Sequence, residues 1–322
     1  MTSLPAPTAL VADLGGTNTR VALTRGAIVQ TETIKRFRNA DYEDLPAVLR
    51  MYMADQPAKP EAACVAMAGP VRDGVGKLTN LNWTVERVAV AAATGAKTVA
   101  ILNDLQAQGH ALDHLTPDVV QTILPGQKAA EHSARLVVGV GTGMNAAAVY
   151  RLGSRTLVPP AEAGHVSLAA QTEAELRLFN WIAQTNGPPG FEEVLSGRGF
   201  ERVYAWLCSE DGGDTPLDAA AIMQAVNDGT DPRATEAARI FVRMLGRAVS
   251  NLALVHLPFG GIYLCGGVAR HFAPHLNALG FDKAFNDKGR FASFMTQFPV
   301  HLVDDDYAAL SGSAAHLVEL NQ

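Results

Sequence analysis

Residues 9–23 read ALVADLGGTNTRVAL, and this stretch decides the fold. Residues 9–12 have the apolar character of a buried strand, and residues 20–23 resume that character after an interruption. The interruption, residues 13–18, is a turn rich in residues that tolerate unusual backbone angles. The stretch therefore predicts two strands joined by a glycine turn.

The turn has the composition of a phosphate site, although its setting is unusual. A Rossmann or P-loop site runs from a strand into a helix, and neither of their glycine motifs occurs in this chain. In a strand–turn–strand setting, the amides around Gly15 and Gly16 can still face phosphate oxygens, because no side chain blocks close approach. The hydroxyl of Thr17 would add a donor.

A second stretch repeats the pattern. Residues 135–140 read as a strand, Gly141, Thr142 and Gly143 form a turn, and residues 146–150 read as another strand. Glycine–threonine turns are common, so the motif alone is only moderately specific. Two such turns in one chain nevertheless indicate a duplicated α/β architecture.

Between the two turns lies a candidate catalytic carboxylate. Residues 98–102 read as a strand whose carboxyl end delivers Asn103 and Asp104, and ligands of open α/β sheets bind at such ends. An aspartate that accepts a proton from an alcohol beside a phosphate site is the minimum apparatus of a kinase. Asp104 also precedes a helical run, where aspartate is a favoured N-cap, and the two roles can coexist.

Composition excludes several classes of protein. The 322 residues suit two domains, and the net charge of −6 disfavours a nucleic-acid or acidic-membrane partner. The three cysteines are odd in number and widely spaced, which predicts buried thiols rather than disulfides or a zinc site. The chain begins without a signal-peptide pattern and contains no membrane-spanning apolar run, so we expect a cytoplasmic protein.

Further elements follow from local signals. Residues 44–53 have helical spacing, and Asp231 with Pro232 predicts the start of a long helix. Residues 261–265 read as a buried strand that ends at a glycine pair, and residues 269–279 as a helix. The glycine pair, Gly266 and Gly267, could admit a nucleotide base or phosphate, or be a plain turn.

With these pieces in order, the chain resembles the bacterial glucokinases of the actin-like, hexokinase-type ATPase superfamily. The matching stretches follow the family order along nearly the whole chain: residues 11–20, 68–70, 78–80, 102–104, 141–143, 162–165, 193–197 and 265–268. The resemblance implies a duplicated actin-like ATPase (ribonuclease H-like) α/β fold with two domains and a cleft between them. We expect a small domain of residues 1–110, completed by a C-terminal helix at 305–322, and a large domain of residues 111–304.

The resemblance also implies roles for individual residues. Asp104 matches the catalytic base, which takes the proton from the sugar 6-hydroxyl as that oxygen attacks the γ-phosphate of ATP. The residues that match sugar ligands, beside Asp104 itself, are Asn80, Asn103, Glu162, His165 and Glu192. The residues that match the nucleotide site are Ala12, Asp13, Leu14, Gly15, Gly16, Thr17, Gly141, Thr142, Gly143, Gly266 and Gly267.

The implied reaction converts glucose and ATP into glucose 6-phosphate and ADP, the first step of intracellular glucose use. The implied cofactor is Mg²⁺ carried by ATP and lying near Asp13, with no metal site of the protein's own. A homodimer is the family expectation. Glu192 and Glu193 are adjacent, so the sugar ligand could be either, and His165 alone would more often be an ordinary core or surface histidine.

Two observations leave alternatives open. The chain has Asn145, Ala161 and Ala163 where the family usually has glycine, which bears on the identity of the hexose. A non-catalytic sugar-binding regulator on the same scaffold is the other reading. Such repressors carry a DNA-binding segment before the first phosphate strand, for which residues 1–8 are too few, so we expect a kinase.

Overall fold

The structure is a computed structural model that describes residues 8–56, 59–78, 81–213 and 217–320. Asn80, one of the expected sugar ligands, lies outside the described residues. The chain divides into two compact units. The first comprises residues 1–116, 151–160 and 305–322, and the second comprises residues 117–150 and 161–304.

The first unit is built on a six-stranded sheet in the order β3-β2-β1-β5-β9, with β4 also paired to β2. The pair β1/β2 is antiparallel, whereas β1, β5 and β9 are mutually parallel. The strands are β1 (Thr8–Leu14), β2 (Asn18–Arg25), β3 (Ile28–Val29), β4 (Lys35–Arg38), β5 (Ala62–Met67) and β9 (Thr98–Asn103). A small sheet is formed by β6 (Val71–Arg72), β7 (Val75–Lys77) and β8 (Thr84–Glu86).

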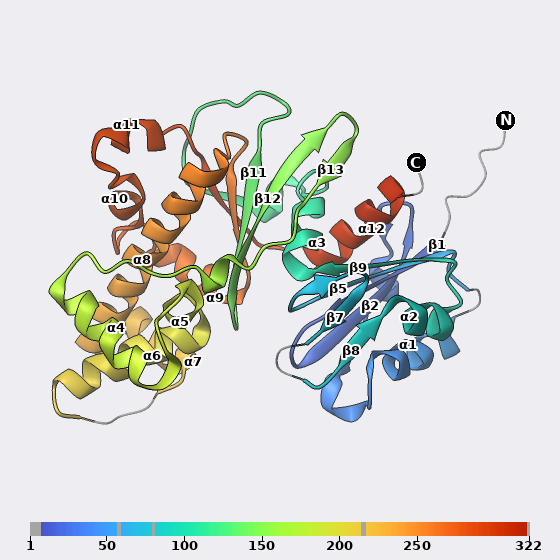
Figure 1. Cartoon of the computed structure of the whole chain (residues 1–322), viewed down its shortest axis with the longest axis horizontal. Coiled ribbons are helices and arrows are strands. Elements are labelled where there is room, and N and C mark those ends of the chain that lie inside the picture. Colours follow the sequence, from blue (N-terminus) through green and yellow to red (C-terminus); the bar gives the residue numbers. More distant parts are fainter. Residues whose placement is uncertain (1–7, 57–58, 79–80, 214–216, 321–322) are drawn as a thin grey trace. The chain divides into compact units, whose positions relative to one another are not determined.

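Helices cover both faces of this sheet (Figure 1). They are α1 (Leu45–Ala54), α2 (Arg87–Thr94), α3 (Asp104–Ala111) and α12 (Ala308–Leu320). Successive residues of a strand point to opposite faces, so Leu10 packs in the core shared with α1 and α2, and Val11 in the core shared with α3 and α12. The C-terminal helix thus returns to the first unit, and its small residues pack closely along α3.

The second unit repeats the arrangement. Its six-stranded sheet has the order β10-β15-β14-β11-β12-β13, in which β11/β12 is antiparallel and β11, β14 and β15 are parallel. The strands are β10 (Val120–Leu124), β11 (Arg135–Val140), β12 (Met144–Leu152), β14 (Ile262–Cys265) and β15 (Val300–Val303), and the sixth strand of the sheet, β13 (Arg155–Leu157), lies in the stretch 151–160 that is grouped with the first unit. The order β12-β11-β14-β15 corresponds to β2-β1-β5-β9, so the predicted duplication is confirmed.

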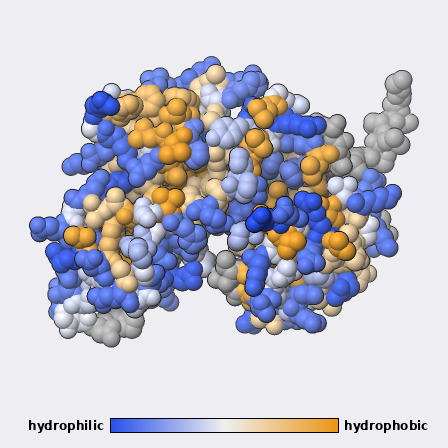
Figure 2. All heavy atoms as spheres, viewed as in Figure 1, coloured by the Kyte–Doolittle hydropathy of each residue, from blue (hydrophilic) through white to orange (hydrophobic). Residues whose placement is uncertain are grey.

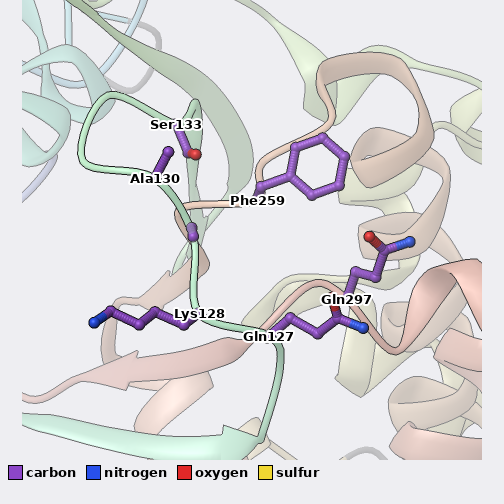
Figure 3. Close-up of a pocket in the computed structure, with 7 residues that line it drawn as sticks. Gln127, Lys128, Ala130, Ser133, Phe259 and Gln297 are labelled. Carbon is purple, nitrogen blue, oxygen red and sulfur yellow. The ribbon is translucent and has the colours of Figure 1, made fainter.

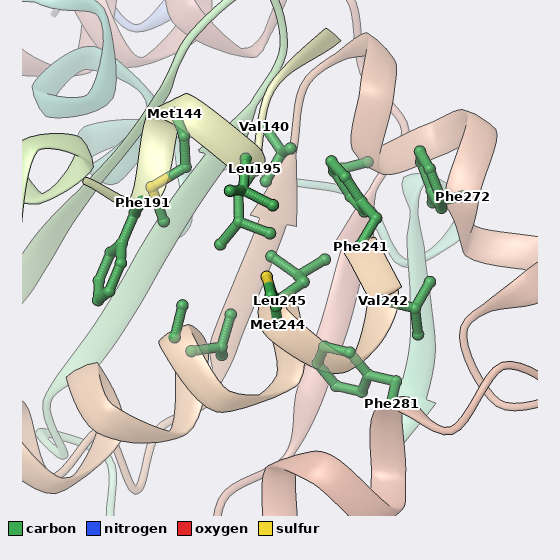
Figure 4. Packing of buried hydrophobic residues seen from close by; sticks show 14 of the residues in the cluster. Val140, Met144, Phe191, Leu195, Phe241, Val242, Met244, Leu245, Phe272 and Phe281 are labelled. Carbon is green, nitrogen blue, oxygen red and sulfur yellow. The ribbon is translucent and has the colours of Figure 1, made fainter. Parts of the chain in front are cut away.

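The core of the second unit forms around α8 (Pro232–His256), which starts at the predicted N-cap Asp231. Phe241 of α8 stacks on Phe272 with ring centroids 4.1 Å apart, and Leu245 of the same helix packs in the same cluster of buried residues (Figure 4). Complete burial of side chains of this size is worth about 1.5–3 kcal/mol each. The other helices are α4 (Glu173–Asn186), α5 (Phe191–Val194), α6 (Gly197–Glu210), α7 (Ala219–Asp228), α9 (Gly267–Phe272), α10 (Phe281–Asn286) and α11 (Ala292–Met295).

One predicted helix is wrong in length. The helix expected over residues 269–279 is the short α9, which ends at Phe272 and is followed by a 3₁₀ turn, Ala273–His275. Pro274 explains the break, because a proline has no amide hydrogen to continue the helical hydrogen-bond pattern. The chain then reaches Gly280, whose φ of 92° precedes α10.

The face drawn in Figure 2 is mostly hydrophilic, with hydrophobic side chains in separate groups. Among the described residues, no helix combines the length and the apolarity needed to cross a bilayer. All three cysteines are buried and free, and burial raises the pKa of the Cys64 thiol to about 12.

Candidate active site

The turn between β1 and β2 has its carbonyl groups bound by the protein. Gly15 N donates to Asn18 O at 3.0 Å, which closes the turn. The Asn39 side chain donates to Gly15 O at 2.8 Å, and the Asn39 amide donates to Thr17 O at 2.9 Å. Within the described chain, Gly16 N and Thr17 N find no protein acceptor. The turn therefore has the arrangement an anion requires, with carbonyls held inward and amides available.

Asn39 was not expected as part of this site. It lies 2% exposed in a 3₁₀ turn after β4, and its Oδ1 also accepts from the Thr19 hydroxyl at 2.7 Å. The buried Asn39 side chain thus joins Gly15 and Thr19, which lie on the two sides of the turn. No signal in the sequence marks this asparagine, because it follows the turn by about twenty residues in an unremarkable polar stretch.

Asp13 is a half-buried residue near the end of β1, between the buried Ala12 and Leu14 and close to this turn. Burial raises the pKa of the Asp13 carboxyl, and Arg20, whose Nη1 lies 3.2 Å from Asp13 Oδ2, opposes that effect. Arg20 stands directly opposite Asp13 in the β1/β2 pair. The carboxylate is therefore compensated by one guanidinium and remains next to the glycine turn.

Asp104 lies at the same edge of the sheet. In the parallel pairing, Leu14 aligns with Met67 and Met67 with Asn103, so β1, β5 and β9 end at one level. Asp104 is the first residue of α3, and it is half-buried. The register therefore brings the predicted base and the first glycine turn together, as expected from the carboxyl ends of parallel strands.

The helix cap is Asn103 rather than Asp104. Asn103 Oδ1 accepts from Leu105 N at 2.9 Å, and Gln106 reaches back to Asn103 N at 3.0 Å to complete a capping box. Asn103 Nδ2 donates to Gly69 O at 3.0 Å. Because Asn103 caps α3, the Asp104 carboxylate is not needed for the cap, although its Oδ1 accepts from Leu105 N at 2.9 Å.

The second glycine turn reproduces the first. Gly141 N donates to Gly143 O at 2.8 Å, and Gly141 O accepts from Gly197 N at 2.9 Å. Gly197 opens α6 after the N-cap Ser196. Since the carbonyl of Gly141 faces Gly197, the amides of Thr142 and Gly143 are left for a ligand within the described chain.

Gly266 lies at the same edge as this turn. In the parallel pair β11/β14, Gly139 aligns with Cys265, so Gly141 and Gly266 both follow the carboxyl ends of their strands. Gly266 has a φ of 98° and packs against the backbone of Val140, which leaves no room for a side chain. Gly267 has nothing within 4 Å of the position that a side chain would take, so it borders open space.

Three predicted sugar ligands are brought together in the second unit. The pKa of Glu162 is raised chiefly by desolvation, an effect that His165 opposes and Glu192 reinforces, so both of these residues lie near Glu162. Glu162 and His165 belong to one 3₁₀ turn, in which His165 N donates to Glu162 O at 3.2 Å. Glu192 comes from α5, and its Oε2 accepts from Met144 N at 3.0 Å.

The neighbouring glutamate faces elsewhere. Glu193 Oε2 lies 2.9 Å from Arg202 Nη1 of α6, so this carboxylate is engaged in an ion pair. The Glu192 carboxylate instead lies against the second glycine turn, where a side chain on Gly143 would collide with it, and 3.6 Å from Arg198. Of the two candidates, only Glu192 is placed with Glu162 and the turn.

The segment after His165 is tied to the core of the second unit. Arg247 of α8 donates to Glu175 of α4 at 2.6 and 3.0 Å and to Gln171 at 2.6 Å, in a nearly buried ion pair. Phe191 N donates to Val166 O at 2.9 Å. The chain that leaves the Glu162–His165 turn is thus held by several bonds.

A hollow of about 290 Å³ lies elsewhere in the second unit (Figure 3). Its lining residues include Ser133, Phe259 and Gln297, which precede the amino ends of β11, β14 and β15. The second glycine turn and the pair Gly266–Gly267 follow the carboxyl ends of β11 and β14, so the hollow is not part of the candidate active site. Among the described residues, no group of three or more His, Cys, Asp or Glu side chains is placed to hold a metal ion.

Comparisons with known proteins decide the family. The glucokinase family profile matches residues 10–320. A glucokinase of Erwinia tasmaniensis is 34% identical over 313 residues, a span that covers 96% of each chain. The chain belongs to the glucokinase family. The resemblance inferred from the sequence motifs is therefore confirmed.

Solved structures of this family agree with the fold. The crystal structure of a glucokinase from an Antarctic psychrotroph superposes with a TM-score of 0.84 at 32% identity, covering 97% of this chain and 99% of that one. A glucokinase from Balamuthia mandrillaris, solved in complex with glucose, has a TM-score of 0.83 at 20% identity, covering 99% and 95%. The second likeness concerns the fold alone. The predicted actin-like ATPase fold is confirmed.

Proposed function

We propose that the chain transfers the γ-phosphoryl group of ATP to the 6-hydroxyl of glucose, which yields glucose 6-phosphate and ADP. Membership of the glucokinase family over almost the whole chain sets the class of reaction. The observation that carries the proposal is the register of β1, β5 and β9, which puts Asp104 at the same sheet edge as the first glycine turn.

Asp104 is proposed as the general base. Its carboxylate would accept the proton of the 6-hydroxyl while that oxygen forms a bond to the γ-phosphorus. The bond from the γ-phosphorus to the β,γ-bridging oxygen breaks, and ADP leaves with the electron pair. Capping of α3 by Asn103 supports this role, since it fixes the backbone of Asp104 at the first residue of the helix.

Glu162, His165 and Glu192 are proposed as ligands of the sugar hydroxyls, together with Asn80 and Asn103. A site that pairs each hydroxyl with a polar group rejects an analogue that lacks one hydroxyl by about 10⁴-fold, because the partner is left unpaired. The Asn103 side chain already makes two hydrogen bonds within the protein. Its amide can still donate its second hydrogen, so this ligand role requires no loss of the cap.

The two glycine turns are proposed to bind the phosphates of ATP, and Gly266 and Gly267 to border the adenosine. Mg²⁺ carried by ATP would neutralise charge that develops on the phosphates. Asp13 is the carboxylate beside the first turn and is the residue proposed to face this ion through water. The homodimer, the cytoplasmic location and the place in glycolysis are further expectations of the family.

The test is turnover with MgATP in a coupled assay, against glucose, mannose, fructose, glucosamine and N-acetylglucosamine. We expect glucose-dependent ADP release by the unmodified protein. The Asp104→Asn variant should lose kcat by about 10²–10⁴-fold, the usual contribution of a positioned base. Glucose affinity, measured by calorimetry, should change by less than the loss of kcat.

The matched control is Asp282→Asn, which changes an exposed aspartate in the first turn of another helix, α10. That variant should keep normal turnover. Unchanged kcat in Asp104→Asn would refute the assignment of the base. Glucose binding without turnover in the unmodified protein would instead identify a sugar-binding regulator, and turnover only with another hexose would replace glucose as the substrate.

A further inference from the structure

Asn145 uses one side-chain amide to hold the backbone on both sides of Glu162. Its Nδ2 donates to Ala161 O at 2.7 Å, and its Oδ1 accepts from Ala163 N at 2.8 Å. The same oxygen accepts from Ala146 N at 2.8 Å, which fixes the side-chain rotamer. Both donor and acceptor of the amide are thus directed at the residues that flank Glu162.

This bridge acts where the chain enters the second unit. Residues 151–160 belong to the first unit, and the chain rejoins the second unit at Ala161. Downstream of His165 the described chain has several ties, including Val166 O to Phe191 N and the pairing of Ser167 with Gly190. Upstream of Glu162, Asn145 binds the carbonyl of Ala161, the residue at which the chain enters the second unit.

Local backbone geometry makes the position of Glu162 depend on such a restraint. Glu162 has φ −125° and ψ 56°, outside the helical and extended regions. Two residues later, Gly164 packs so closely on the carbonyl of Met144 that a side chain there would collide with it. The turn that carries Glu162 and His165 therefore packs against the start of β12, which directly follows the second glycine turn.

We propose that Asn145 is a positioning residue that sets the backbone of Glu162, and through it the affinity and discrimination of the site for a hexose. The inference rests on the proposed function in one respect, namely that Glu162 binds a sugar hydroxyl. Binding groups must be held within about 0.5 Å of their productive position, which a loop achieves only when other groups restrain it. Asn145 supplies that restraint from a strand.

The experiment is a double-mutant cycle on glucose KM with Asn145→Ala, Glu162→Ala and the combined variant. Asn145→Ala removes three side-chain hydrogen bonds, two of them to the residues that flank Glu162, and we expect glucose KM to rise about tenfold while KM for MgATP changes less than about twofold. In the Glu162→Ala background the same substitution should raise glucose KM less than about twofold, because the residue it positions is gone. Glu162→Ala should no longer distinguish glucose from certain deoxyglucose analogues. Asn145→Ala should distinguish glucose from the same analogues less well than wild type does.

Two further variants define what the amide does. Asn145→Asp keeps an acceptor for Ala163 N but cannot donate to Ala161 O, so its effect should fall between wild type and Asn145→Ala. Asn227→Ala removes an exposed asparagine that also makes one side-chain hydrogen bond, to His275, and should leave glucose KM unchanged. Equal KM effects of Asn145→Ala with and without Glu162, or no effect at all, would overturn the proposal.

A readout independent of activity separates this inference from the proposed function. Hydrogen exchange of peptides that span residues 161–166 should be faster in Asn145→Ala than in wild type, because Ala163 N loses its acceptor. Unchanged exchange would refute the restraint even in an active enzyme. Faster exchange in a protein that phosphorylates no hexose would establish the restraint and refute the proposed function.

Discussion

At the scale of single residues, the adjacent carboxylates of Glu192 and Glu193 have different contacts. Glu192 and Glu193 differ by one position, yet one lies against the second glycine turn and the other pairs with Arg202. Side chains of consecutive helical residues point about 100° apart, so a single step along α5 moves a carboxylate from the candidate site to the α6 side. Composition could not distinguish the two.

This placement predicts opposite outcomes for two similar substitutions. Glu192→Gln should raise glucose KM by about tenfold or more, because it removes a charged hydrogen-bond acceptor from the proposed sugar site. Glu193→Gln should leave glucose KM nearly unchanged and cost at most modest stability, since its partner Arg202 is partly exposed. Steady-state kinetics of both variants provide the measurement, and a larger KM effect for Glu193→Gln would reverse the assignment.

At the scale of elements, the contact between α3 and α12 buries two imidazoles in the first unit. His110 and His316 lie with ring centroids 4.5 Å apart, and their buried Nδ1 atoms have no hydrogen-bond partner among the described residues. Glu319 Oε2 lies 3.8 Å from His110 Nδ1 and also accepts from Thr156 N at 3.2 Å. Burial and the neighbouring His316 lower the pKa of His110 to about 3, and burial lowers the pKa of His316.

The pair should make the free energy of unfolding depend on pH. In the unfolded chain an imidazole has a pKa of about 6.5, so below that pH the unfolded state binds protons that the folded state excludes. Stability is therefore fully present above pH 6.5 and falls as the pH falls. From His110 alone we expect the free energy of unfolding to be about 2 kcal/mol lower at pH 5 than at pH 7, as measured by urea denaturation at each pH.

The variants that test this separate pH dependence from overall stability. The double variant His110→Gln/His316→Gln should show a smaller loss between pH 7 and pH 5, whatever its stability at pH 7. His132→Gln, at an exposed histidine, should retain the full loss. An equal loss in the double variant would show that other groups carry the acid sensitivity.

At the scale of the whole molecule, a bound sugar is expected to change the free energy of unfolding. A ligand that binds only the folded state stabilises it by about 2.7 kcal/mol at a concentration of 100 Kd. Glucose that binds the folded chain should therefore stabilise it against unfolding.

Thermal unfolding checks this expectation. Saturating D-glucose should raise Tm by about 5 °C or more, given shifts of roughly 2–4 °C per kcal/mol for domains of 150–250 residues. L-glucose, which presents the same hydroxyls in mirror-image arrangement, should leave Tm unchanged. Equal shifts with both sugars would indicate a general solvent effect and would contradict a specific sugar site.

Local sequence was sufficient for much of the fold and for part of the candidate site. Residues 9–23 and 135–150 predicted their hairpins, and Asp231 with Pro232 predicted the start of α8. These features depend on neighbours in the chain, because strand propensity, glycine turns and helix caps each involve a few consecutive residues. The placement of Asp104 at the end of a buried strand also followed from local pattern.

Tertiary structure decided the features that join distant parts of the chain. Several hydrogen bonds join residues that are too far apart in the sequence for any local pattern to predict them. They link Asn39 to Gly15, Asn145 to Ala161 and Ala163, and Arg247 to Glu175. Likewise, residues 151–160 join the first unit although they follow a strand that starts in the second. A hydrogen bond across such an interval depends on how sheets and helices pack. The sequence by itself therefore determined the strands and turns, and tertiary packing determined the long-range hydrogen bonds that fix the turns in place.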